Sequence, residues 1–161
     1  MLYAVAFISG LLVKLVDWLE DDRKSKHPGK YVIGLAYGIL IGYIIGNASF
    51  SLIFLAALVA QVLARKIDTT AHRIGFAASV ITALFFQLPA IDIYLFGYFL
   101  ALAFLDEVDY IGKLRPLTKY RPFLKIGPIP LILIGRIDYL IGIWAFDIGY
   151  EMFNLLQKHK K

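Results

Sequence analysis

Long apolar runs alternate with short charged connectors along this chain. Three stretches contain no charged residue at all: 31–64, 74–91 and 93–105. A helix needs roughly 20 apolar residues to cross the hydrocarbon core of a bilayer, so runs of this kind are typical of membrane-spanning helices. The pattern predicts spans at about 2–16, 31–46, 50–64, 74–88 and 93–105.

The last part of the chain has a different pattern. The segment 129–156 is mainly apolar, but it contains several charged residues and follows Gly-Pro-Ile-Pro at 127–130. It fits a sixth span, or a short dip followed by an amphipathic helix lying in the membrane interface. The pattern favours a span whose C-terminal part runs into the interface, and both readings stay open.

The composition agrees with an all-α, polytopic membrane bundle of five or six helices in a single domain. The chain has 161 residues, of which 60% are hydrophobic, whereas soluble domains are usually about 45–50% apolar. The chain contains no cysteine, which excludes a disulfide scaffold and thiolate metal sites.

The basic residues predict the topology. Thirteen of the seventeen Lys and Arg residues fall in three connectors: 14–30, 65–73 and 113–125. The connectors 46–49 and 87–92 contain none. The positive-inside rule therefore places the three basic connectors in the cytoplasm and the N-terminus outside the cell membrane. This topology implies two tight helical hairpins, 31–64 and 74–105.

Glycines recur every fourth residue in the second predicted span, at Gly34, Gly38, Gly42 and Gly46. Residues at this spacing lie near one helix face, and small residues let helices approach closely in a bilayer. The third span repeats alanine at the same spacing (Ala56, Ala60, Ala64), and the fourth has a weaker stripe (Gly75, Ser79, Ala83). The pattern favours packing of the second span on the third. The alternatives are a surface for self-association or for a membrane-protein partner, and a face for a lipid or prenyl chain.

Acidic residues gather where the predicted spans meet the cytoplasm. The three groups are Asp17 with Glu20, Asp21 and Asp22; Asp68 with His72; and Asp106 with Glu107 and Asp109. Convergent carboxylates are suitable ligands for Mg²⁺, which often bridges to a substrate phosphate. The candidate Mg²⁺ ligands are Asp17, Asp21, Asp68, Asp106 and Asp109, and the candidate catalytic residues are Asp68, His72, Asp106 and Asp109.

Basic side chains flank these groups. Arg65, Lys66 and Arg73 are the candidates for binding a phosphate or lipid headgroup, because cationic side chains pair with phosphate oxygens. The competing interpretation is structural. Exposed ion pairs in connectors contribute only about 0–1 kcal/mol, and Lys and Arg at helix ends anchor to anionic lipid.

Arg136, Asp138 and Asp147 lie inside the last apolar segment. A charge in the middle of a bilayer is costly, so such residues usually pair or line a polar cavity. Residues at i and i+2 do not share a helix face, so Arg136 is expected to reach an acid on another helix, such as Asp106 or Asp109. The alternatives are an interhelical clamp and an ion or substrate path.

Three function classes follow from these patterns. The first is a binding, assembly or structural subunit of a larger membrane complex, and it rests on the glycine stripe. The second is a Mg²⁺-assisted enzyme acting on a phospholipid or polyprenyl phosphate at the cytoplasmic face. The third is a small oligomeric transporter or channel. No nucleotide-binding, zinc-protease or serine-hydrolase motif is present, and the net charge of +5 is explained by the cytoplasmic connectors without nucleic-acid binding.

Overall fold

The computed structural model describes residues 1–22 and 27–158, and this part of the chain is helical with no β-strand. The long helices are α1 (Leu2–Asp17), α2 (Gly29–Asn47), α3 (Ser51–Leu63), α4 (Thr70–Phe85), α5 (Ile93–Glu107) and α8 (Asp138–Lys158). Shorter elements connect them: η1 (Trp18–Asp22), η2 (Gly112–Leu114), α6 (Arg115–Tyr120), α7 (Pro122–Ile126) and η3 (Ile129–Ile134).

Local sequence signals set several helix ends. Thr69 caps α4 by accepting a hydrogen bond from the backbone N–H of His72. Asp92 caps α5 by accepting from the N–H groups of Tyr94 and Leu95. Both are residue types favoured at this position, because their oxygens satisfy N–H groups that have no partner within the helix. Gly135 ends η3 with a φ of 76°, a backbone conformation that glycine adopts without strain.

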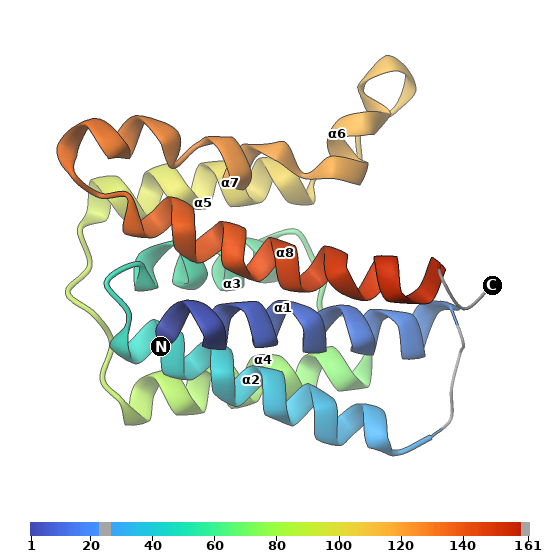
Figure 1. Cartoon of the computed structure of the whole chain (residues 1–161). Coiled ribbons are helices and arrows are strands. Elements are labelled where there is room, and N and C mark those ends of the chain that lie inside the picture. Colours follow the sequence, from blue (N-terminus) through green and yellow to red (C-terminus); the bar gives the residue numbers. More distant parts are fainter. Residues whose placement is uncertain (23–26, 159–161) are drawn as a thin grey trace.

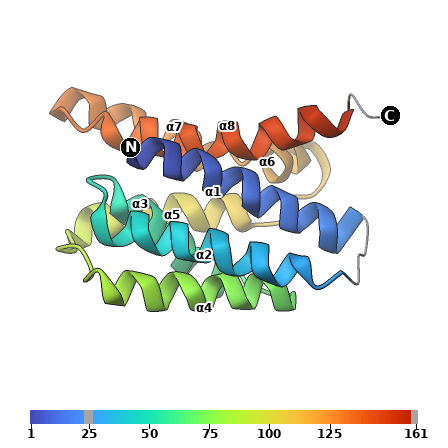
Figure 2. The ribbon, with the colours of Figure 1, turned by 60° about the horizontal axis from the view of Figure 1, so that its bottom comes forward.

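The long helices run side by side as a bundle, with their connectors at its two ends (Figures 1 and 2). Successive long helices from α1 to α5 run in opposite directions. The connector 64–69 and the segment from 108 to α6 therefore lie at the end where α1 finishes. Met1 and the connectors 48–50, 86–92 and 135–137 lie at the opposite end. The described parts of the three basic connectors thus lie toward one end, as the charge pattern predicts.

The pairing of helices differs from the expected hairpins. α2 packs mainly against α4, and α3 packs mainly against α5, whereas α2 and α3 contact each other much less. The prediction of two tight hairpins was therefore wrong. The units α2–α3 and α4–α5 pack side by side, so that α2 contacts α4 and α3 contacts α5.

The glycine stripe faces α4 and not α3. A Cβ atom on Gly34 would lie 2.6 Å from the carbonyl oxygen of Ala71, and one on Gly42 would lie 2.5 Å from that of Ser79. A Cβ atom on Gly38 would overlap the carbonyl oxygen of Gly75. Close helix packing was correctly predicted, but its partner is the weaker small-residue stripe of α4.

α8 packs extensively against α1, which also packs against α2. Cβ atoms on Gly10 of α1 and Gly149 of α8 would overlap the carbonyl oxygens of Phe146 and Phe7, respectively. The segment 129–156 is not one continuous helix. It consists of the short η3, a turn at Gly135 and most of α8, which belongs to the bundle.

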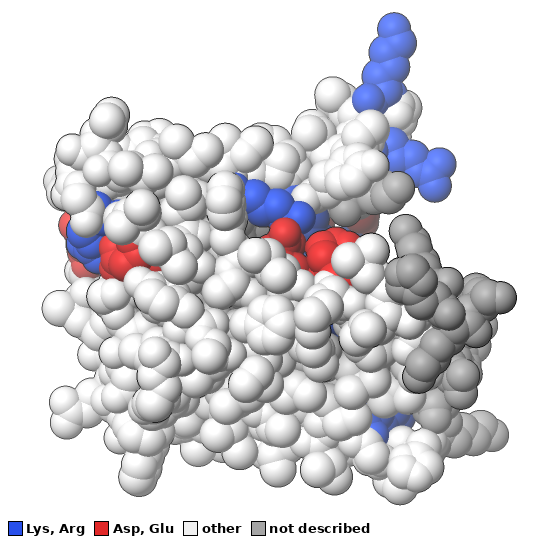
Figure 3. Space-filling view, viewed as in Figure 1, with Lys and Arg blue, Asp and Glu red and all other residues white. Residues whose placement is uncertain are grey.

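Within the described residues, two helices are long and apolar enough to cross a membrane by length and composition, Leu2–Glu20 and Gly29–Asn47. The helices Ser51–Leu63 and Thr70–Phe85 and the segment Pro122–Ile134 are apolar but shorter. Much of the surface is apolar as well. Figure 3 shows a face that is almost entirely uncharged, apart from small clusters of charge along it and at the end of the bundle where α6 lies.

Candidate functional site

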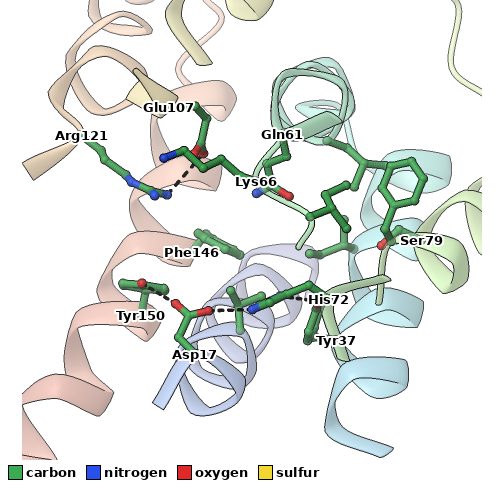
Figure 4. A pocket seen from close by; sticks show the side chains of 15 residues that line it. Asp17, Tyr37, Gln61, Lys66, His72, Ser79, Glu107, Arg121, Phe146 and Tyr150 are labelled. Atoms are coloured by element: carbon green, nitrogen blue, oxygen red, sulfur yellow. Dashed lines mark hydrogen bonds and ion pairs between the residues drawn. The ribbon is translucent and has the colours of Figure 1, made fainter. Parts of the chain in front are cut away.

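Four side chains from four helices form a hydrogen-bonded row inside the basic end of the bundle (Figure 4). The hydroxyl of Tyr150 donates to Oδ2 of Asp17 over 2.6 Å. Oδ1 of Asp17 lies 3.1 Å from Nε2 of His72, and Nδ1 of His72 lies 2.9 Å from the Tyr37 hydroxyl. We call these four residues the relay. It joins α8, α1, α4 and α2.

The relay has a consistent assignment of protons. A carboxylate only accepts hydrogen bonds, so Asp17 favours a proton on Nε2 of His72. In the neutral imidazole, Nδ1 then accepts the proton of the Tyr37 hydroxyl. The side chains of Asp17 and His72 are each about one fifth exposed (21%), so the relay is not sealed inside the protein.

The local fold of α2 and α4 explains why Tyr37 and His72 meet. The Thr69 cap places His72 in the first turn of α4. One turn further along, Gly75 has no side chain, and a Cβ atom there would overlap the phenol ring of Tyr37. The missing side chain lets the Tyr37 ring lie against the α4 backbone and reach the imidazole. Val16, Tyr37 and Ala71 form a small buried cluster beside it.

A second group of polar side chains lies across the cavity from the relay (Figure 4). It contains Gln61 and Lys66, together with Glu107 and Arg121, whose Oε1 and Nη1 atoms lie 3.3 Å apart. Lys66 also pairs with Asp109, at 2.8 Å from its Oδ2. We call Gln61, Lys66, Glu107 and Arg121 the opposite wall.

Glu107 is the most buried charged side chain of the opposite wall, with 9% of it exposed. It lies beyond the apolar run that ends at Leu105. Burial raises the pKa of the Glu107 carboxyl, against the opposing effect of the Arg121 and Lys66 charges. The protonated form of this carboxyl is therefore favoured more than in water.

The space between the two walls is a cavity of two adjoining lobes. The polar lobe has a volume of about 140 Å³ and is lined by the relay and the opposite wall. The second lobe, of about 130 Å³, is lined mainly by apolar side chains, including Phe54, Ala57, Leu58 and Ile143. Ile41, Leu58, Gln61, Glu107, Arg121 and Phe146 line both lobes. The second lobe is thus the more apolar of the two, although Asp106, Lys125 and Asp147 also line it.

The predicted site residues are only partly brought together. Of the candidate catalytic residues, His72 lines the cavity, whereas Asp68 is exposed beside the Thr69 cap. Asp109 is exposed and paired with Lys66. Of the candidate headgroup-binding residues, Lys66 lines the polar lobe, whereas Arg65 and Arg73 are exposed and are not among its lining residues.

Asp106 has a structural role in the fold. Its carboxylate oxygens accept hydrogen bonds from the backbone N–H groups of Phe123 (2.9 Å) and Leu124 (2.8 Å) at the start of α7. Burial raises the pKa of the Asp106 carboxyl, although these two hydrogen bonds act to lower it. Asp106 therefore ties α7 to the end of α5.

The candidate Mg²⁺ ligands do not form a group. Among the described residues, no set of three or more His, Asp or Glu side chains is arranged to hold a metal ion. Asp17 meets His72, while Asp106 and Asp109 have the separate partners given above. The side chain of Asp21 lies outside what the structure describes.

The charged residues of the last segment also differ from the expectation. Arg136 does not reach Asp106 or Asp109. Its Nη2 donates to the Ser49 carbonyl (3.2 Å) and the Tyr139 hydroxyl (2.8 Å), and its Nε lies 3.5 Å from Oδ1 of Asp138. The i, i+2 pair forms because Arg136 precedes α8 and is not helical. Asp147 pairs with Lys125 at 2.9 Å, and both line the second lobe.

Several cavity residues were missed by sequence reasoning. Tyr37 and Tyr150 are uncharged residues of apolar helices, and nothing in the local pattern separates them from packing tyrosines. The only signal at Tyr37 was its place beside Gly38 in the glycine stripe. Arg121 lies in a basic connector that was interpreted as a membrane anchor.

Comparisons with protein-family models, with curated proteins and with solved structures gave no match to this chain.

Proposed function

We propose that the chain is a multi-spanning membrane protein that binds an amphiphile with a phosphate headgroup in the two-lobed cavity. The observation that carries this proposal is the continuity of the lobes. Six side chains, Arg121 among them, are shared between a lobe that Lys66 and His72 line and a lobe whose surface is mainly apolar.

The membrane part of the proposal is supported by the surface. Large apolar side chains are exposed on the outer helices, including Ile81 (68%), Leu84 (60%) and Phe85 (80%) of α4. Soluble monomers rarely expose contiguous apolar patches larger than a few hundred Å². Two helices of spanning length and three basic connectors at one end agree with a bundle that crosses a bilayer.

The basic side chains of the polar lobe favour a phosphate headgroup, although the carboxylates of Asp17 and Glu107 line the same lobe. Lys66 and Arg121 both line it, and both side chains bind phosphate oxygens, the guanidinium in a bidentate manner. His72 and the Tyr37 hydroxyl add further polar groups from the relay. A cavity needs roughly 10–15 Å³ to hold one water molecule, so each lobe has room for a much larger group.

The apolar lobe favours an acyl or prenyl chain attached to that headgroup. Ligand pockets are usually lined by hydrophobic side chains with a few polar groups that fix orientation. Here Phe54, Ala57 and Ile143 lie in the second lobe, Lys66 and His72 line only the polar lobe, and the Lys125 of the second lobe is paired with Asp147.

The alternative of a subunit that associates through its glycines has less support. Gly34, Gly38 and Gly42 are buried against α4, so the stripe offers no free surface. The transporter hypothesis has support from one of its three residues. Asp147 lines the second lobe, whereas Arg136 and Asp138 lie at the start of α8, at the end of the bundle away from the basic connectors.

The test is lipid binding to the purified full-length chain, measured by native mass spectrometry in detergent. Dioleoyl phosphatidic acid and dioleoyl phosphatidylcholine are compared at equal concentrations. We expect retention of phosphatidic acid to exceed that of phosphatidylcholine, and to fall in Lys66→Gln. Ala57→Trp fills the apolar lobe and should abolish retention. Ala101→Trp, at an exposed position of α5, is the matched control and should bind normally.

Equal retention of both lipids in the wild type and in all three variants would overturn the proposal, because it would indicate lipid on the outer surface only. Competition with inorganic phosphate distinguishes a lipid headgroup from free phosphate as the ligand. Displacement of the lipid at a low concentration of phosphate would show that the polar lobe alone determines binding.

A further inference from the structure

The relay has the hydroxyl–base–carboxylate arrangement found in nucleophilic catalysis. A hydroxyl within hydrogen-bond reach of a base, with that base oriented by a third group, is the common arrangement of nucleophilic catalysis. Here the hydroxyl is that of Tyr37, the base is His72, and the orienting carboxylate is that of Asp17. A helix-packing role alone does not require three consecutive hydrogen bonds across four helices.

The occupied ring nitrogens of His72 decide which group can react. Nε2 lies against Asp17 and Nδ1 against the Tyr37 hydroxyl. The imidazole therefore acts on a bound ligand through the Tyr37 hydroxyl and not directly. Tyr150 contacts the carboxylate and not the base. Tyr37 is thus the one hydroxyl of the relay whose proton the imidazole accepts.

The opposite wall provides a proton donor and cationic side chains on the side of the cavity away from Tyr37. In phosphoryl transfer the attacking and leaving oxygens lie roughly in line, so the group that protonates the leaving oxygen faces the nucleophile across the phosphorus. Glu107 lies on that wall, and burial raises the pKa of its carboxyl. Lys66 and Arg121 beside it can stabilise the charge of the transferred group.

Resting on the proposed binding of a phosphate amphiphile, we infer that the cavity hydrolyses the phosphate ester of its ligand through a covalent phosphotyrosine at Tyr37. In the first step, the Tyr37 oxygen forms a bond to phosphorus, and the bond between phosphorus and the ester oxygen breaks. The Tyr37 proton moves to Nδ1 of His72. The leaving alkoxide takes the proton of Glu107 and departs as an alcohol.

The second step restores the site. The Glu107 carboxylate takes a proton from water, whose oxygen attacks phosphorus. The bond between phosphorus and the Tyr37 oxygen breaks, and the phenolate regains its proton from His72. The net reaction converts a phosphomonoester and water into an alcohol and inorganic phosphate. Asp17 is a positioning residue, because it acts on the ligand through His72.

p-Nitrophenyl phosphate is the probe that separates the two steps. Its leaving group departs without protonation, so Glu107→Gln should still form the intermediate but should not hydrolyse it. We expect intact-mass spectrometry of this full-length variant to show one added phosphoryl group, which peptide mapping assigns to Tyr37. The double variant Glu107→Gln/Tyr37→Phe should carry none. Glu107→Gln/Tyr43→Phe is the matched control and should retain the group, because Tyr43 packs against Phe86, away from the relay.

Phosphate release by the wild type gives the second readout. His72→Asn should reduce the release of phosphate by roughly 10²-fold or more, the usual contribution of a general base. Phosphatidic acid retained by Tyr37→Phe together with no phosphotyrosine in Glu107→Gln would overturn the catalytic inference and leave the binding proposal standing. No retention of phosphatidic acid by Tyr37→Phe, which cannot hydrolyse the lipid, would overturn both.

Discussion

The carboxylate of Asp17 accepts a hydrogen bond from the hydroxyl of Tyr150, 133 residues further along the chain, over 2.6 Å. This contact joins the first long helix to the last one at the basic end of the bundle. The other oxygen of the same carboxylate faces His72. Asp17 therefore holds together the α1–α8 pair and orients the imidazole of α4.

Replacing Asp17 with Asn should change the tautomer of His72. The carboxylate accepts from Nε2–H, whereas the amide can turn its NH₂ group toward that nitrogen and donate to it. The proton should then move to Nδ1, and Tyr37 would become the acceptor. The ¹⁵N chemical shifts of labelled imidazole nitrogens distinguish the two tautomers. Unchanged shifts for His72 in Asp17→Asn would contradict the relay, and His27, in the connector before α2, serves as the internal reference.

Gly38→Ala should destabilise the fold, because the added methyl group overlaps the backbone carbonyl of Gly75. Overpacking of this kind typically costs about 1–3 kcal/mol. The matched control is Gly97→Ala in α5, where no atom lies within 4 Å of the added Cβ. Alanine is favoured over glycine in a helix by roughly 0.5–1 kcal/mol, so the control should be neutral or stabilising. Thermal unfolding followed by circular dichroism in detergent measures both, and equal melting temperatures would contradict the α2–α4 packing.

The helices were predictable from sequence, but their partners were not. The apolar run 31–46 lies within α2, and 93–105 lies within α5, because a run without charge has no signal for a break. The four glycines indicated that α2 packs closely against another helix, but they did not indicate which helix. The stripes at Ala56 and at Gly75 fit the same spacing, and only the fold of the connectors decides between them.

The candidate site was predictable to a smaller extent. Asp17, Lys66 and His72 were identified because charged residues beside apolar runs are conspicuous. Tyr37 and Tyr150 become functional only through their distances to His72 and Asp17, and distance across a bundle has no local signature. The expected metal cluster was absent from the described residues for the same reason. The carboxylates that the sequence pattern grouped together have separate partners: Asp17 contacts His72, Asp106 accepts from α7, and Asp109 pairs with Lys66.

Asp106→Ala should loosen α7 without affecting the relay. The variant removes the acceptors of the Phe123 and Leu124 N–H groups, and a buried N–H without a partner costs about 1–3 kcal/mol. Hydrogen–deuterium exchange across Pro122–Ile126 should accelerate. Asp109→Ala is the control, because its carboxylate is 73% exposed and an exposed ion pair contributes only about 0–1 kcal/mol. Equal exchange rates in the two variants would contradict the role given to Asp106.

Glu107→Gln should change how stability depends on pH. Burial raises the pKa of Glu107 in the folded state, above the ordinary value of about 4.3 that applies to the unfolded chain. The unfolded chain therefore releases its proton first, and the folded state loses stability as pH rises through this interval. The glutamine variant has no carboxyl at this position, so its stability should fall less as pH rises from about 4. Chemical denaturation in detergent across this range measures the difference, and parallel curves for the two proteins would contradict the effect of burial.

The orientation of the bundle is tested with single cysteines, for which this cysteine-free chain is well suited. Asp68 and Asn47 are both exposed, and they lie at opposite ends of the bundle, after α3 and at the end of α2. Because basic connectors stay in the cytoplasm, Asn47→Cys should react with a membrane-impermeant maleimide added to intact cells. Asp68→Cys should react only after the membrane is opened. Reaction of both cysteines from outside would contradict a spanning bundle, and the reverse pattern would invert the topology. The second result would place the polar lobe at the outer face, so its phosphate-bearing ligand would have to reach it from that side.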